Sequence, residues 1–117
     1  MKKRFDYYKK VALPHIRTTV YFLDLSKLQG DSVKGVAYTM PMGDYSGKLP
    51  ESIEICVFIQ NIKEAVKKIE YMPVIAHECT HVIQYICEAI NAEIQEEKEH
   101  MAHIMSHLFE ELLELKH

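Results

Sequence analysis

The sequence predicts an α+β fold: a small, mostly antiparallel sheet with an edge strand, then a helix that carries two histidines, then a C-terminal helix. Apolar residues alternate with a period of two in residues 53–59, which is typical of a strand. They recur at helical spacing in residues 74–90 and again in residues 92–116. No repeat, linker-like tract or shift in composition divides the 117 residues, so residues 1–117 are expected to form a single domain.

The N-terminal part is expected to hold one helix and two strands. Residues 3–13 have Phe5, Tyr8 and Ala12 at helical spacing. Since Pro14 would end a helix at this point, a helix is predicted over residues 3–13. Residues 17–25, RTTVYFLDL, are rich in β-branched and aromatic side chains and predict a strand. A shorter strand is expected at residues 36–39.

The middle of the chain predicts a loop, a strand and a helix. Residues 41–50 hold two glycines and two prolines and are expected to form a loop. The strand at residues 53–59 has one face that leans polar, which favours an edge position in the sheet. Apolar residues at helical spacing then predict a helix of about ten residues; they are Ile62, Ala65, Val66 and Ile69.

Two helices are predicted in the C-terminal half. Pro73 suits the first turn of the first helix, because a proline there removes no intrahelical hydrogen bond. This helix has an apolar side made of Ile75, Cys79, Val82, Ile83, Ile86 and Ile90. The second helix has an apolar side made of Ile94, Met101, Ile104, Met105, Leu108, Leu112 and Leu115. We expect the chain to reverse between the two helices, near Asn91.

Charge and composition exclude several classes of protein. With 14 basic and 17 acidic residues the formal charge is −3, so the chain lacks the positive field that nucleic-acid binding requires, and no nucleic-acid partner is expected. No stretch is apolar over the roughly 20 residues that cross a bilayer, and charged residues near the N-terminus interrupt a signal peptide. We therefore expect no membrane association and a cytoplasmic location.

The three cysteines, Cys56, Cys79 and Cys87, match neither a metal knuckle nor a disulfide framework. They are expected to be reduced, partly buried thiols.

The chemistry of the chain is concentrated in His77-Glu78-Cys79-Thr80-His81, an HExxH motif. Residues four apart on a helix differ by about 40° in azimuth and about 6 Å in height, so both imidazoles can reach one ion at about 2.1 Å. Glu78 lies beside this face, where its carboxylate can accept a proton from a water molecule that the metal activates. The motif predicts a metal site at His77 and His81, with Glu78 as the catalytic residue.

The segment VIAHECTHVI, residues 74–83, resembles the extended signature of the zincin metallopeptidases. Residues 99–105, EHMAHIM, resemble the glutamate-bearing helix of small phage-type and prophage-type HExxH proteins. This resemblance implies a minimal zincin-like core, with residues 74–90 as the active-site helix and residues 53–59 as the edge strand that binds an extended substrate. It also implies Zn²⁺ as the cofactor, with Glu99 as its third ligand, the arrangement of the gluzincin branch.

Residues other than Glu99 could be the third metal ligand. One uninterrupted helix would separate His81 from Glu99 by about 27 Å, so the chain has to fold back, although no glycine or proline lies between them. Glu96 and His103 are the alternatives to Glu99, and Glu97 and His100 also lie near enough in sequence to compete.

The leading hypothesis is an enzyme, a zinc metallopeptidase that hydrolyses a peptide or protein substrate with a metal-activated water. The first alternative is a catalytically silent binding or regulatory protein, of the phage-encoded kind, that retains zinc; the small size of the chain favours it. In a second alternative the metal only stabilises the core, but such a site has no use for Glu78. The residues identify neither the substrate nor the oligomeric state.

Other residues carry weaker predictions. Glu88 could orient a ligand imidazole, and Tyr45 and Tyr85 are candidates to stabilise an oxyanion. His100, His103 and His107 share one helix face and could form a second metal patch, although solvated histidines are the commoner explanation. His15 is not expected to have a role.

Overall fold

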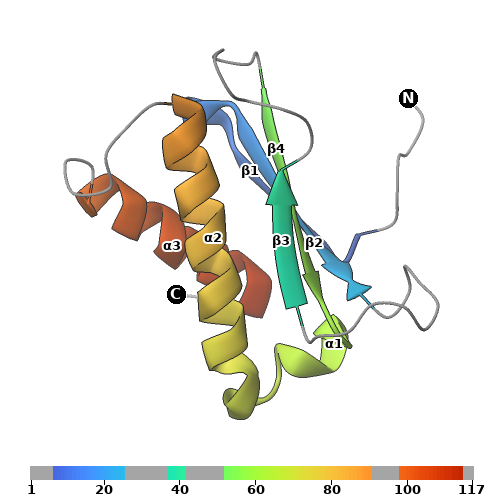
Figure 1. Cartoon of the computed structure of the whole chain (residues 1–117). Helices are drawn as coiled ribbons and strands as arrows, with labels where there is room; N and C mark the ends of the chain where they lie inside the picture. The colour runs from blue at the N-terminus through green and yellow to red at the C-terminus, as the bar shows by residue number, and fades with distance from the viewer. Residues whose placement is uncertain (1–6, 26–36, 42–51, 91–97, 115–117) are drawn as a thin grey trace.

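The computed structural model describes residues 7–25, 37–41, 52–90 and 98–114. A four-stranded sheet is covered on one face by two long helices, α2 (Met72–Ile90) and α3 (Lys98–Leu113) (Figure 1). The strands are β1 (Lys9–Leu13), β2 (Thr18–Asp24), β3 (Ala37–Pro41) and β4 (Ile53–Ile59). The predicted α+β class is confirmed.

The sheet has the strand order β1-β2-β4-β3. The central pair, β2 and β4, is parallel, with Val20 opposite Ile55, whereas both outer strands pair antiparallel to their neighbours. The strands predicted at residues 17–25, 36–39 and 53–59 are therefore confirmed as β2, β3 and β4.

The prediction of a helix over residues 3–13 is wrong for residues 7–13, the part of this segment that the structure describes. Lys9–Leu13 is a strand in which buried Val11 and Leu13 alternate with exposed Lys10 and Ala12. A short 3₁₀ turn, η1 (Pro14–Ile16), then leads into β2, with Arg17 in the left-handed region at φ 49°. Pairing with β2 supplies the backbone partners of this segment, and this tertiary contact outweighs the helical spacing of its apolar residues.

The edge position predicted for Ile53–Ile59 is also wrong. This strand, β4, lies between β2 and β3, and both of its faces are covered. Cys56 and Phe58, on the face that leaned polar, are buried in a small cluster with Leu23 and Leu25. The edge strand beside α2 is instead β3.

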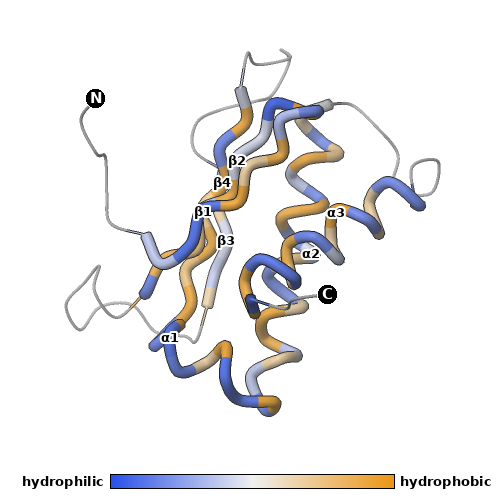
Figure 2. Tube along the Cα trace, turned by 180° about the vertical axis from the view of Figure 1, so that it is seen from behind, coloured by the Kyte–Doolittle hydropathy of each residue, from blue (hydrophilic) through white to orange (hydrophobic). Residues whose placement is uncertain are grey.

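The main core lies between the sheet and the helices. Its fully buried residues include Val20 and Phe22 of β2, Ile55 and Val57 of β4, and Leu108 of α3. Burying each such side chain stabilises the fold by about 1.5–3 kcal/mol. Figure 2 shows hydrophobic and hydrophilic positions alternating along α2 and α3, as expected of helices with one buried side.

The predicted sides of the two long helices are confirmed. On α2, Ile75, Cys79, Val82, Ile83 and Ile86 are buried, and on α3, Met101, Ile104, Leu108 and Leu112 are buried. Pro73 lies in the first turn of α2, and α2 ends at Ile90, where the reversal was predicted. Loop residues 42–50 and the apolar side chains of Ile90, Ile94 and Leu115 lie outside the described part.

The helix predicted after β4 is shorter than expected. α1 (Ile62–Ala65) has four residues, and a 3₁₀ turn, η3 (Ile69–Tyr71), connects the segment to α2. Ile69, expected on the apolar side of this helix, is 84% exposed. Among the described residues, no helix combines the length and apolar character needed to cross a membrane.

Candidate metal centre

The HExxH motif occupies the second and third turns of α2, which lies against β3 and β4. Because the apolar side of α2 faces the core, the helix turns the two histidines away from it. His77 is exposed and His81 is half-buried, whereas Glu78 is only 5% exposed. The motif therefore presents two imidazoles toward solvent and one carboxylate toward the neighbouring strand.

The two imidazoles converge on one point. Nε2 of His77 and Nε2 of His81 are 3.1 Å apart, and the ring planes are nearly perpendicular, at 86°. Two nitrogen ligands of a tetrahedral ion at 2.0–2.1 Å lie about 3.3 Å apart. The observed separation is close to this value, so these two side chains fit one Zn²⁺ ion with little movement.

Gln84 sets the tautomer of His81. Its amide oxygen lies 2.8 Å from Nδ1 of His81. An amide oxygen can only accept a hydrogen bond, so Nδ1 carries the proton and Nε2 carries the lone pair that a metal needs. Gln84 thus does for His81 what the sequence suggested for Glu88.

Glu78 is held by a residue of the edge strand. The Thr39 hydroxyl lies 2.6 Å from Oε1 of Glu78 and 3.3 Å from the Glu78 backbone carbonyl oxygen. It therefore donates its strongest hydrogen bond to the carboxylate. This contact joins β3 to α2 and fixes the carboxylate on the side of α2 that faces the strand.

The two remaining residues of the motif do not offer ligands. Cys79 is fully buried, and burial, followed by the negative charge of Glu78, raises the pKa of its thiol to about 12. The Thr80 hydroxyl donates to the backbone carbonyl of Ala76 at 2.8 Å. Cys56, Cys79 and Cys87 are all buried and none of them forms a disulfide.

The predicted third ligand is not gathered with the histidines. Glu99 is exposed in the first turn of α3, His103 lies in a separate pocket on α3, and Glu96 lies outside the described residues. Within the described ranges, no three His, Cys, Asp or Glu side chains lie close enough to share one metal ion. The structure thus brings His77 and His81 together, whereas Glu78 contacts Thr39, and Glu99 stays a prediction.

Sequence reasoning missed Thr39 and Gln84. Gln84 lies three residues after His81, a helical spacing that could have indicated contact. Thr39 is 39 residues from Glu78, and only the packing of β3 on α2 reveals it. Of the predicted oxyanion candidates, Tyr45 lies outside the described residues, and Tyr85 packs against the main core.

The chain was compared with models of protein families, with curated proteins and with solved structures, and none of the three comparisons found a match.

Proposed function

We propose that this protein is a zinc-dependent peptidase in which His77 and His81 hold the metal and Glu78 is the catalytic base. The observation that carries the proposal is the 3.1 Å separation of the two Nε2 atoms, one turn of α2 apart. Glu78, which follows His77 in the sequence, is held by Thr39. The exposure of His77 leaves room for water and substrate at the metal, as a catalytic site requires.

The residues divide the reaction between them. A bound Zn²⁺ supplies a Lewis acid that polarises the scissile carbonyl and lowers the pKa of the attacking water. Glu78 takes the proton from this water as the new carbon–oxygen bond forms, and returns it to the amine nitrogen as the carbon–nitrogen bond breaks. Since Thr39 donates to Oε1, we assign the proton transfer to Oε2. Glu99 remains the proposed third ligand.

An extended peptide is the proposed substrate, and β3 replaces β4 as the strand that would bind it. Among the described strands, β3 pairs only with β4, so its other edge offers backbone donors and acceptors to a peptide. Tyr38 and Met40 are exposed on the face opposite Thr39 and would contact alternate side chains of such a peptide. We also propose a cytoplasmic location, because the three buried cysteines form no disulfide.

One observation favours the alternative of a zinc-binding protein without catalysis. Glu78 is only 5% exposed and already accepts a hydrogen bond, so a water molecule has limited access to it. In that case the same two histidines would bind the metal, and β3 would bind a partner without cleaving it.

Two variants distinguish the peptidase from the zinc-binding protein without catalysis. The wild type, Glu78→Gln and His77→Ala are loaded with Zn²⁺, their metal content is measured, and cleavage of an unfolded protein substrate is followed by mass spectrometry. We expect Glu78→Gln to retain zinc and lose cleavage, and His77→Ala to bind less zinc than the wild type and lose cleavage. A wild type that binds zinc but cleaves no faster than Glu78→Gln would refute the peptidase and support the binding protein. A wild type in which His77→Ala changes neither zinc content nor cleavage would refute both.

A further inference from the structure

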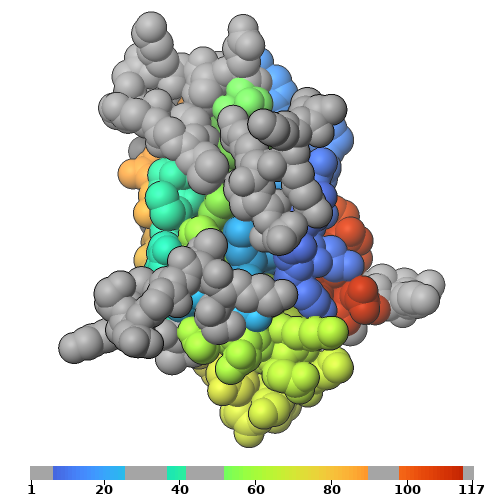
Figure 3. Space-filling model, turned by 90° about the vertical axis from the view of Figure 1, so that its right-hand side faces the viewer, coloured from blue at the N-terminus to red at the C-terminus, as the bar shows by residue number. Residues whose placement is uncertain are grey.

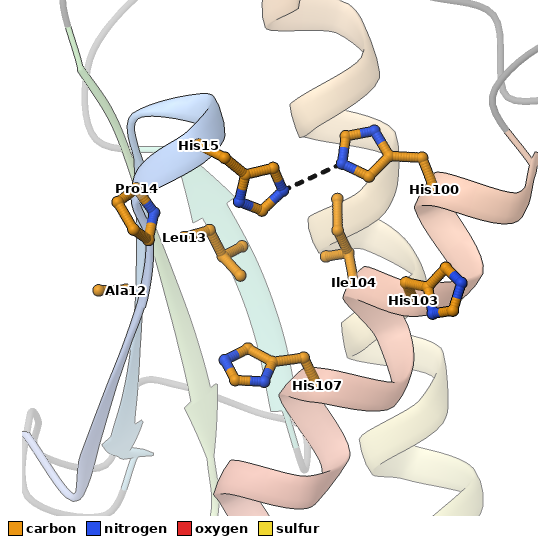
Figure 4. Close-up of a pocket in the computed structure, with 8 residues that line it drawn as sticks. All are labelled: Ala12, Leu13, Pro14, His15, His100, His103, Ile104 and His107. Atoms are coloured by element: carbon orange, nitrogen blue, oxygen red, sulfur yellow. Dashed lines mark hydrogen bonds between the residues drawn. The ribbon is translucent and has the colours of Figure 1, made fainter.

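A second group of histidines lies where α3 meets the β1–η1 corner, next to residues of the main core. A pocket of about 340 Å³ opens between the β1–η1 corner and α3, and four of its lining residues are histidines. The lining consists of Ala12, Leu13, Pro14, His15, His100, His103, Ile104 and His107 (Figure 4). Figure 3 shows part of β1 and part of α3 side by side at the surface.

Two of these histidines meet across the pocket, from elements far apart in the chain. Nε2 of His15, in η1, lies 3.0 Å from Nε2 of His100, in α3. The ring centroids are 5.2 Å apart, and the planes are inclined by 48° (Figure 4). The separation of the nitrogens nearly equals the 3.1 Å between the two histidines of the HExxH motif.

A hydrogen bond between these imidazoles uses only one proton. One Nε2 donates, and the other must accept with its lone pair. A divalent transition metal can replace that proton and take both lone pairs, because the nitrogens already lie near the roughly 3.3 Å expected for two ligands of a tetrahedral ion. Imidazole is a preferred ligand for such ions, so a pair facing nitrogen to nitrogen is suited to bind one.

The pocket around the pair is suited to a small ion with open coordination positions. Leu13 and Ile104 give it apolar walls, and His107 lies on the same face of α3, two turns after His100. In the part of the chain that the structure describes, no third His, Cys, Asp or Glu is close enough to join the pair directly. Water or a small anion would therefore complete the coordination.

We propose that His15 and His100 form a second Zn²⁺ site, which links the β1–η1 corner to α3. The two residues are 85 positions apart in sequence and meet only in the folded chain. An ion that binds both of them stabilises the folded state, because the unfolded chain lacks the preformed pair. This site is separate from the HExxH pair and does not depend on the proposed peptidase activity.

The experiment measures zinc binding in a variant that lacks the HExxH site. The His77→Ala/His81→Ala variant is titrated with Zn²⁺ by calorimetry, and its thermal midpoint is measured with Zn²⁺ and with a chelator. We expect one bound equivalent and a higher midpoint with zinc. Adding His15→Ala or His100→Ala should weaken binding by roughly 100-fold, because half of the protein ligands are gone.

His103→Ala is the matched control. His103 lines the same pocket and is exposed on the same helix, but its ring lies apart from the pair (Figure 4). We expect it to leave the affinity within about threefold of the background, a change that corresponds to roughly 0.6 kcal/mol. Equal midpoints of all variants in chelator would confirm that the substitutions leave the fold intact. Absence of zinc binding in the background variant, or binding that His15→Ala does not weaken, would overturn the second site.

The two proposals can fail separately. A wild type whose single zinc equivalent is lost in His15→Ala but kept in His77→Ala would refute the HExxH metal centre and support the second site. A single equivalent lost only in His77→Ala would do the reverse.

Discussion

The Thr39 hydroxyl lies 2.6 Å from Oε1 of Glu78, and this contact joins the edge strand of the sheet to the helix that carries the HExxH motif. Glu78 is one of two polar or charged residues among the buried set of the described chain, so its carboxylate needs a partner there. The placement of the catalytic base thus depends on a residue of the strand that we propose binds the substrate.

Replacing Thr39 with Val, which has nearly the same shape, removes the donor to Glu78. A buried carboxylate that loses its hydrogen bond costs about 1–3 kcal/mol, so the free energy of unfolding should fall by that amount. We expect kcat for peptide cleavage to fall about tenfold or more, since the base loses its fixed position, while zinc affinity stays unchanged. Initial rates of peptide cleavage give kcat, and urea unfolding gives the free energy of unfolding.

The conservative variant Thr39→Ser keeps the hydroxyl and serves as the control. It should recover most of the lost kcat. If Thr39→Val and Thr39→Ser have equal kcat, the hydroxyl does not position Glu78.

Gln84 is predicted to tune the metal site without touching the metal. Its amide oxygen lies 2.8 Å from Nδ1 of His81 and accepts the Nδ1–H hydrogen bond, which keeps the lone pair on Nε2. Partners of this kind typically contribute 10- to 100-fold to metal affinity. Zinc titration of Gln84→Ala should therefore show a loss in this range, measured in the His15→Ala background so that only the HExxH site is counted.

Glu88→Ala is the matched control for Gln84→Ala, because Glu88 is exposed one turn further along α2. Its zinc affinity should equal that of the background. A loss in Glu88→Ala that matches the loss in Gln84→Ala would point to a general effect of helix α2 rather than to the tautomer of His81.

Cys79 is predicted to make the fold sensitive to alkaline pH. Burial, and then the charge of Glu78, raises its pKa from 9.0 to about 12, so the folded state favours the neutral thiol. The resulting stabilisation is fully present below the unfolded pKa of 9.0 and is lost as the pH rises from there toward 12. The free energy of unfolding of the wild type should therefore fall above pH 9 more steeply than that of Cys79→Ala.

Urea unfolding of both proteins at pH 8, 9 and 10 measures this difference. Cys79→Ala will be less stable throughout because it leaves a cavity, so the comparison rests on the slope with pH and not on the absolute value. Parallel slopes for the two proteins would contradict a raised pKa for this thiol. At pH 8 the native wild type should also resist alkylation at Cys79, since the thiolate is the reactive form.

The sequence predicted the structure best where the spacing of apolar residues within one segment decides it. The period of two in residues 53–59 and the apolar sides of α2 and α3 depend on neighbouring residues, and the structure agrees with them. The sequence predicted the structure less well where contact with a distant segment of the chain decides it. Lys9–Leu13 is a strand because β2 pairs with it, and β4 is central because β3, which precedes it in the chain, forms the outer edge.

The same distinction holds for the candidate site. His77 and His81 lie within five residues, and the convergence of their imidazoles follows from helix geometry alone. Thr39, and the meeting of His15 with His100, come from contacts across 39 and 85 positions, which no local pattern encodes. The sequence therefore indicated the two proposed metal ligands but not the residue that holds the proposed base.

The third ligand can be tested directly. Glu99 lies exposed in the first turn of α3, beside His100, so it must be examined in the His15→Ala background to exclude zinc at the second site. If Glu99 is the third ligand, Glu99→Ala should weaken zinc binding by roughly 100-fold or more, because one of three protein ligands is lost. Calorimetric titration with Zn²⁺ gives the affinity.

Glu111→Ala is the control, since Glu111 is exposed on the same helix three turns further on. It carries the same change in charge and should bind zinc as the background does. If Glu99→Ala binds zinc as tightly as Glu111→Ala while His77→Ala does not bind it, Glu99 is not a ligand. Glu96 and His103, the alternatives that the sequence leaves open, would then be replaced by Ala in turn, and the true ligand should show the 100-fold loss.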